Sequence, residues 1–168
     1  TVDPAWSYMD SYSIGPWGDV IVYGVCDFNL GSPATITSVT TWYSANGEWA
    51  DGTYDVLVDV YEKTGTIPVT GTDDPLTTGV TVSGTLTTVG DGTMSLTVTG
   101  LSISLDAGDY WIMASPTVPD GPGFREFHMA SIDNIMDPSA WIEFGGWLPG
   151  SWGANFDGLD GAILIEGD

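Results

Sequence analysis

The sequence predicts an all-β protein folded as a single antiparallel β-sandwich, and three observations lead to this prediction. Residues that favour strands recur in short alternating runs, whereas the chain holds only five Glu, one Lys and one Arg to support helices. Turn dipeptides rich in Gly, Asn and Asp separate these runs at short intervals. The 168 residues are 42% hydrophobic and 12% aromatic, which is enough for one sizeable core.

The clearest predicted strand covers residues 53–62, with the sequence TYDVLVDVYE. Val56 and Val58 fall on one face of this strand, and Asp55 and Asp59 fall on the other. We therefore expect the first face to pack on the core and the second to lie in solvent.

A second clear strand covers residues 93–105, where the alternation changes phase at Gly100. A phase change at a glycine predicts a bulge or a bend in the strand. The other predicted strands are residues 19–26, 38–43, 80–89, 109–114, 125–130, 141–144 and 162–166. Many short strands at this spacing favour a sandwich over a parallel sheet.

Three stretches of the chain, residues 26–62, 104–115 and 152–168, resemble bacterial secreted jelly-roll domains. These relatives are the choice-of-anchor and PEP-CTERM-type surface proteins, which combine a DDF opening, a TITSV strand, an aGtYW strand and a terminal Trp…Asp-aliphatic strand. The resemblance implies a jelly-roll-like β-sandwich over residues 26–168 and an extracellular or cell-surface location. Residues 1–25 lie outside it, as an N-terminal segment that is either a donor strand or the first strand of the sandwich.

The charge balance excludes two classes of partner. The formal net charge is −21, and Lys63, Arg125 and His128 are the only side chains that can carry a positive charge. Neither a nucleic acid nor an anionic membrane surface can be bound by so few cations. The apolar runs are also far shorter than the ~20 residues of a membrane helix, so we expect no membrane insertion.

Patterns typical of catalysis are missing from the sequence. It contains no Gly-x-Ser-x-Gly, Walker, HExxH or CxxC motif, so we expect no enzymatic activity. His128 is interpreted as a strand histidine, while Glu126 and Glu143 would be the first carboxylates to test in a glycosidase. Cys26, the only cysteine, is expected to be a buried and inert thiol.

Clustered carboxylates open one possibility for a cofactor, a structural calcium ion. Asp73 and Asp74 are adjacent, and Asp157 and Asp160 follow a turn, so both groups offer the loop oxygens that hard cations prefer. The alternative interpretation is that these aspartates only stabilise turns.

Self-assembly is the predicted function. We expect a non-enzymatic structural subunit of an extracellular filament, pilus-like fibre or surface layer, with copies of the same chain as its partners. Natural sheets protect their edges with Lys and Pro, and this strand-rich chain has a single Lys. The N-terminal segment supplies the residues expected at the contact by strand donation: Trp6, Trp17, Val20, Val22 and Val25.

The net charge does not forbid such assembly. Over the roughly 8,000 Å² of surface expected for this size, charges lie ~20 Å apart on average, beyond the ~8 Å screening length at physiological salt.

The alternative function is a secreted carbohydrate-binding module. The chain has eight Trp, an unusually large number, and three of them lie in predicted loops or turns: Trp49, Trp147 and Trp152. Exposed indole rings at these positions would stack on the faces of sugars in a polysaccharide.

Overall fold

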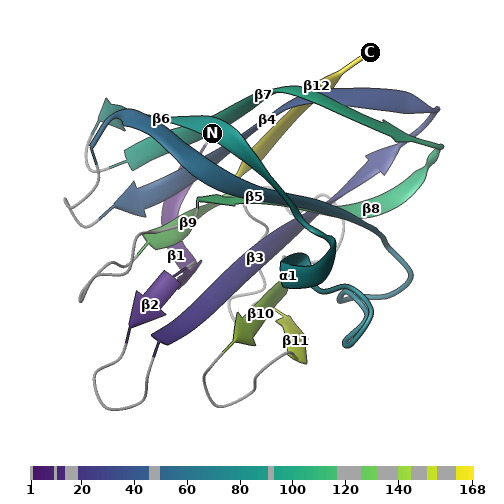
Figure 1. Cartoon of the computed structure of the whole chain (residues 1–168), viewed down its shortest axis with the longest axis horizontal. Coiled ribbons are helices and arrows are strands. Elements are labelled where there is room, and N and C mark those ends of the chain that lie inside the picture. Colours follow the sequence, from purple (N-terminus) through teal and green to yellow (C-terminus); the bar gives the residue numbers. More distant parts are fainter. Residues whose placement is uncertain are drawn as a thin grey trace.

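The computed structural model describes residues 2–9, 11–13, 19–45, 50–90, 93–116, 126–131, 140–144, 151–154 and 162–168, and most of them lie in antiparallel strands (Figure 1). The strands are β1 (Val2–Met9), β2 (Ser11–Ser13), β3 (Asp19–Leu30), β4 (Ala34–Ala45), β5 (Gly52–Glu62), β6 (Val80–Gly90), β7 (Thr93–Leu105), β8 (Gly108–Pro116), β9 (Glu126–Ser131), β10 (Ala140–Phe144), β11 (Ser151–Ala154) and β12 (Ile163–Gly167). One short helix, α1 (Pro75–Thr78), precedes β6. The all-β prediction is confirmed.

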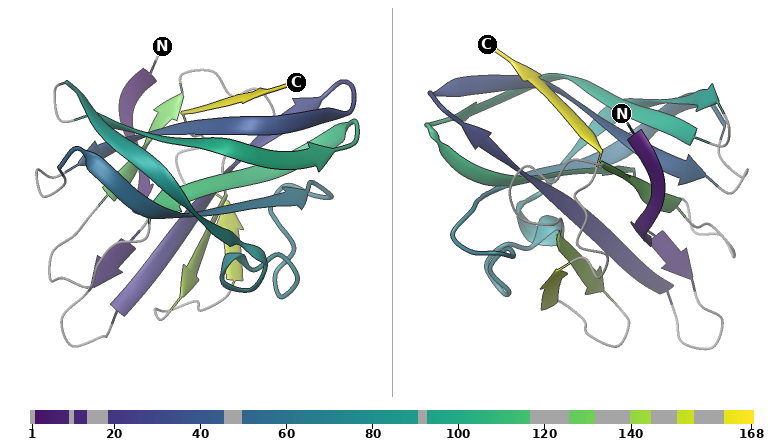
Figure 2. Two further views of the ribbon diagram at one scale, coloured as in Figure 1. Left: turned by 45° about the horizontal axis from the view of Figure 1, so that its top comes forward. Right: turned by 180° about the vertical axis from the view of Figure 1, so that it is seen from behind.

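The strands hydrogen bond in the order β1-β9-β4-β7-β6-β5-β8-β3-β10-β11, and β12 and β2 pair with β4 and β3. Seven strands form a nearly closed sheet, so the protein is a rolled sheet with an inside and an outside. Figure 2 shows β12 beside β4. The edge of β4 that pairs with β12 also pairs with β9 further along the strand.

Most strands predicted from alternation are present within a few residues of their expected bounds, including residues 53–62 as β5 and 93–105 as β7. The bend predicted at Gly100 is confirmed. Gly100 has a positive φ of 74°, and the β4–β7 register shifts beside it, between the pairs of Ile36 and Ser38. Strands β1, β2 and β11 and the helix α1 were not predicted.

The interior of the roll holds the main hydrophobic core. Alternate residues of β4, β5, β6, β7 and β8 fill it, and its fully buried members include Val56, Leu86, Leu96, Val98 and Ile112. Cys26 is 2% exposed, which confirms its predicted burial. Period-two alternation on paired strands brings these side chains to one face, where their removal from water stabilises the fold.

The prediction that β5 has a solvent-facing side is wrong for residues 57–61. Leu57, Asp59 and Tyr61 lie outside the roll, yet each is 9% exposed or less. They belong to an outer layer that also contains Val25 and Trp111. The segment between β5 and β6 and the strand β11 cover this face, and Figure 1 shows α1 close to β10 and β11.

Some buried polar groups in the outer layer are paired, while Trp111 Nε1 and Ser115 Oγ have no hydrogen-bond partner among the described residues. The Asp59 carboxylate accepts hydrogen bonds from the Val60 backbone N–H at 2.8 Å and from the Thr78 hydroxyl, which ties α1 to β5. Burial, followed by the neighbouring Asp59 carboxylate, raises the pKa of the Tyr61 phenol far above its usual range.

Gly84 provides a test of packing inside the roll. A Cβ added there would lie 2.6 Å from Val56 Cγ2 and 3.1 Å from Leu96 Cδ1, and both side chains are fully buried and cannot move aside. We expect Gly84→Ala to lower the free energy of unfolding by ~1–3 kcal/mol in urea denaturation. Gly31→Ala, where a Cβ meets nothing within 4 Å, is the control and should change stability by less than ~0.5 kcal/mol. Equal effects of the two substitutions would contradict the packing described here.

Tyr61 predicts how stability responds to alkaline pH. The folded protein raises the pKa of this phenol, so the protonated phenol contributes to stability. That contribution is complete below the pKa of Tyr in the unfolded chain, about 10, and is lost as pH rises further. Tyr61→Phe should therefore show a shallower loss of unfolding free energy between about pH 9 and pH 11 than the wild type. Denaturant titrations followed by circular dichroism at each pH measure the two slopes, and identical slopes would contradict the prediction.

Candidate functional site

The candidate site is a mouth in the roll where β6 and β7 separate. These two strands pair from Gly84 opposite Val98 toward their connecting turn, and no pair joins the described residues 80–83 and 99–105. A cavity of about 360 Å³ opens between them, lined by Val58, Asp59, Val60, Val80, Val82, Gly100, Leu101, Ser102 and Ile103. We call these nine residues the β6–β7 mouth.

Local geometry explains why the strands separate. The first residues of β6 pair with β5, with Val80 opposite Val58, while β7 bends at Gly100 and continues beside β4 alone. Gly79 permits the sharp entry into β6, because a Cβ there would lie 2.5 Å from the Pro75 carbonyl oxygen.

The opposite end of β6 is held in place. Asp51 Oδ1 accepts hydrogen bonds from the Thr88 backbone N–H at 2.6 Å and the Thr88 hydroxyl at 2.7 Å. These bonds hold the pKa of the Asp51 carboxyl below its usual range. The roll is therefore tied at one end of β6 and open at the other.

The mouth is largely apolar, and the strand edges beside it carry neither a charge nor a proline. Val80 is 62% exposed, and Val82, Leu101 and Ile103 are half-buried. Residues 80–83 read VTVS and residues 99–105 read TGLSISL, so neither edge contains a charged residue or a proline. Charges, Pro and bulges are the devices with which natural sheets block pairing with other chains, and of these the two edges have only the bend at Gly100.

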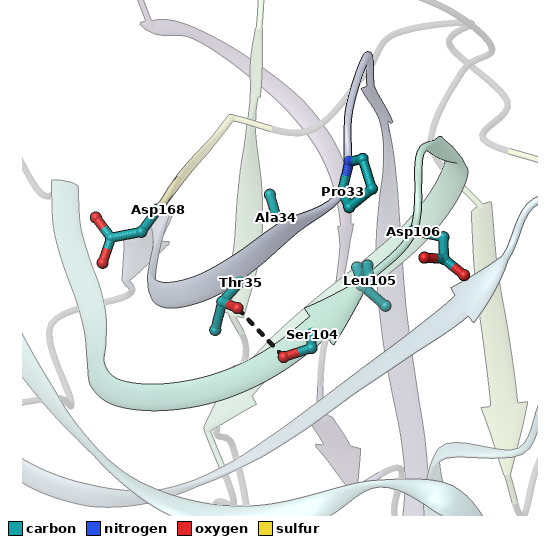
Figure 3. Close-up of a pocket in the computed structure, with 7 residues that line it drawn as sticks. All are labelled: Pro33, Ala34, Thr35, Ser104, Leu105, Asp106 and Asp168. Atoms are coloured by element: carbon teal, nitrogen blue, oxygen red, sulfur yellow. Dashed lines mark hydrogen bonds between the residues drawn. The ribbon is translucent and has the colours of Figure 1, made fainter.

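A second, open hollow of about 340 Å³ lies near the start of β4 and the end of β7. Thr35 Oγ1 and Ser104 Oγ share a hydrogen bond of 3.2 Å at its floor. Figure 3 shows the carboxylates of Asp106 and Asp168 on opposite sides of this bond. Since the two carboxylates do not converge, this hollow offers neither a paired acid–base site nor a multidentate metal site.

Asp73 and Asp74, two of the predicted metal ligands, serve the segment that covers the outer layer. Asp73 Oδ2 accepts a hydrogen bond from the Val69 N–H at 2.6 Å, and Asp74 Oδ2 accepts one from the Thr77 hydroxyl at 3.1 Å. The structure thus supplies the turn-stabilising role that was the alternative to calcium binding. Among the described residues no group of three or more His, Cys, Asp or Glu could hold a metal ion. Asp157 and Asp160 lie outside the described residues, and calcium binding there stays a prediction.

Trp152 corrects the prediction of a sugar-stacking platform. This side chain is 6% exposed, its ring meets Tyr61 edge to face at 5.9 Å between centroids, and its Nε1 donates to the Asp73 carbonyl at 2.7 Å. Its ring cannot present a face to a sugar, because that ring seals the outer layer. Trp49 and Trp147, the other two candidates, lie outside the described residues.

The N-terminal segment pairs within its own chain. β3 crosses the boundary expected at residue 25, and Val25 is fully buried in the outer layer, so its side chain is not available to a neighbour in this fold. Val20 and Val22 lie on β3 opposite β2 and β10, and Trp6 lies on β1 opposite β9. The side-chain surroundings of these three residues, and all of Trp17, lie outside the described part.

The residues considered for catalysis lie on different parts of the sheet. Glu126 and His128 are on β9 opposite β4, and Glu143 is on β10 opposite β3. Their side chains fall outside the described part of the chain, so the prediction of no enzymatic activity is untested.

Sequence reasoning missed the mouth as a site, although its signals are in the sequence. The phase change at Gly100 and the uncharged runs on either side of the cavity mark it. That the two runs face each other across an opening follows only from the register of β5, β6 and β7.

Comparisons with protein-family models, curated proteins and solved structures found no match to this chain. Across the described ranges, none of the helices has the length and apolarity needed to span a membrane.

Trp152 gives a test of the outer layer. Trp152→Phe keeps an aromatic ring but removes the Nε1–Asp73 hydrogen bond, so we expect a loss of ~1 kcal/mol in the free energy of unfolding. Trp152→Ala also removes the ring and should cost ~3–5 kcal/mol. Urea titrations measure both values. Losses below ~0.5 kcal/mol for both variants would show an exposed side chain and contradict the contacts described.

Proposed function

We propose that this protein is a non-enzymatic structural subunit that assembles with copies of itself into an extracellular filament, fibre or surface layer. The observation that carries the proposal is the β6–β7 mouth, where two unpaired and uncharged strand edges flank an apolar cavity. Such an opening is suited to an extended strand, which binds through main-chain hydrogen bonds and places alternate side chains in the cavity.

The pairing pattern supports a jelly-roll-like sandwich as the framework of this subunit. Strand β5 pairs with β6, β4 pairs with β7, and β3 pairs with β8, so each pair is nested inside the next. The pair of β1 and β9 lies outside all three. Nested antiparallel pairs are what results when one long two-stranded ribbon is rolled up, and this is the organisation of a jelly roll.

A second copy is the occupant that the chemistry of the mouth favours. A strand entering it must be largely uncharged, because an unpaired charge in the apolar cavity would remain desolvated. This chain offers many strands of that kind, with Thr and Ser between aliphatic residues, as in residues 80–83 and 99–105. Screening at physiological salt keeps the net charge of −21 from preventing the contact.

The test places a lysine on the strand edge beside the mouth. Thr81 is an exposed residue on the part of β6 that pairs with β5 but not with β7, whereas Thr85 is an exposed residue of the same strand paired on both sides, with Thr53 and Thr97. Thr81→Lys should raise the protein concentration needed for assembly by about tenfold or more, or ~1.4 kcal/mol, because a lysine on an open strand edge is one of the devices that block pairing with another chain and its charge would lose hydration where a second strand docks. Thr85→Lys, with the same change in charge, should leave assembly unchanged. Sedimentation and electron microscopy of negatively stained samples measure the assembled fraction.

Two outcomes would reject the proposal. Wild-type protein that stays monomeric at millimolar concentration would exclude self-assembly. Equal assembly of both variants would exclude the mouth as the contact, and circular dichroism of each variant confirms that loss of assembly is not loss of folding.

A further inference from the structure

The only lysine of the chain makes a buried ion pair. Lys63 Nζ lies 2.8 Å from Asp27 Oδ2, and the two side chains are 7% and 0% exposed. Two charges removed from water in this way lose hydration that their mutual attraction repays only in part. A protein with so few cations has placed one of them where it cannot increase solubility or bind an external anion.

The sheet register shows how the pair is built. Asp27 on β3, Trp111 on β8 and Tyr61 on β5 form one row across the outer face of the roll. Lys63 follows the end of β5, and its backbone N–H donates to the Asp109 carbonyl at 2.8 Å, which fixes it against β8. Its side chain then passes over Trp111, with Nζ 4.4 Å from the ring centroid, to reach Asp27.

This arrangement places the two groups that an amide bond would join side by side. The amine and the carboxyl are held one hydrogen bond apart, and holding two reacting groups together in this way replaces an encounter in solution with a step within one molecule. One proton transfer within the pair, from the Lys63 ammonium to the Asp27 carboxylate, produces the neutral amine and the neutral acid that condense.

We propose that Lys63 and Asp27 condense into an intramolecular isopeptide bond. The Nζ lone pair attacks Cγ of the protonated Asp27 carboxyl, the Nζ–Cγ bond forms, and one carboxyl oxygen leaves with two hydrogens as water. No oxidant, reductant or cofactor takes part, and the product carries no charge, so the cost of burying two ions disappears.

The bond would connect β3 to the end of β5 across β8, between residues 36 positions apart in the chain. Cys26 is the only cysteine, so an internal disulfide is not available to this protein. The isopeptide bond would supply the equivalent constraint on the unfolded chain. This inference stands on the Lys63–Asp27 geometry alone and does not depend on self-assembly.

Mass spectrometry of the intact, denatured full-length protein tests the proposal. We expect wild-type protein to be lighter than its sequence by the mass of one water, and digestion to yield one branched peptide joining the segments around residues 27 and 63. Lys63→Arg retains a cation but has no amine that can condense, and it should show the full sequence mass, as should Asp27→Ala. Asp109→Ala is the matched control, because it removes a neighbouring carboxylate outside the pair and should keep the loss of water.

The wild-type measurement decides the question even if a variant does not fold, since masses are read from denatured protein. A wild-type mass equal to that of the sequence would overturn the proposal and leave a non-covalent ion pair under a cation–π contact. A loss of water that persists in Lys63→Arg would also overturn it, because the dehydration would then lie elsewhere in the chain.

Discussion

The burial of β5 and β8 on both faces is the constraint around which the described structure is organised. Inside the roll these strands contribute Val56 and Ile112 to the main core, and outside it they contribute Tyr61 and Trp111 to a second layer. Strands buried on both sides lose the solvent-facing positions where polar side chains are hydrated. Polar groups that remain on the outer face therefore depend on partners within the protein, and among the described residues Trp111 Nε1 and Ser115 Oγ lack one.

The segment between β5 and β6 supplies hydrogen-bond and ion-pair partners for several of these polar groups. Asp59 is bonded to Thr78 and to its own strand, the Trp152 indole to the Asp73 carbonyl, and Asp27 to Lys63. These bonds attach the segment that connects β5 to β6, and strand β11, to the outside of the roll. The same attachment fixes where β6 begins, because α1 and the tight approach at Gly79 lead directly into Val80.

The start of β6 in turn creates the mouth. Strand β6 enters beside β5, β7 bends away at Gly100, and the sheet cannot close between them. The proposed assembly therefore depends on the outer layer as well as on the edges themselves. The two runs that border the opening contain no charged residue themselves, although Asp59 contributes to the lining.

The amino-acid sequence by itself determined the class of fold and most strand positions. Alternation in residues 53–62 and 93–105 and the bend at Gly100 follow from local rules, since side-chain period, turn residues and glycine conformation depend on neighbours in the chain. Burial of Cys26 followed from the same alternation.

Only the tertiary structure decided which strand faces are exposed to solvent and which distant residues are in contact. Nothing in the local pattern of β5 distinguishes an outward face in solvent from one covered by a segment further along the chain, so Leu57 and Tyr61 were assigned incorrectly. For the same reason Trp152 was taken for an exposed ring, and neither the approach of Lys63 to Asp27 nor the opening between β6 and β7 was foreseen. These features depend on strand register between distant segments, which is set by the packing of the whole roll, so local signals such as the phase change at Gly100 do not show which residues meet.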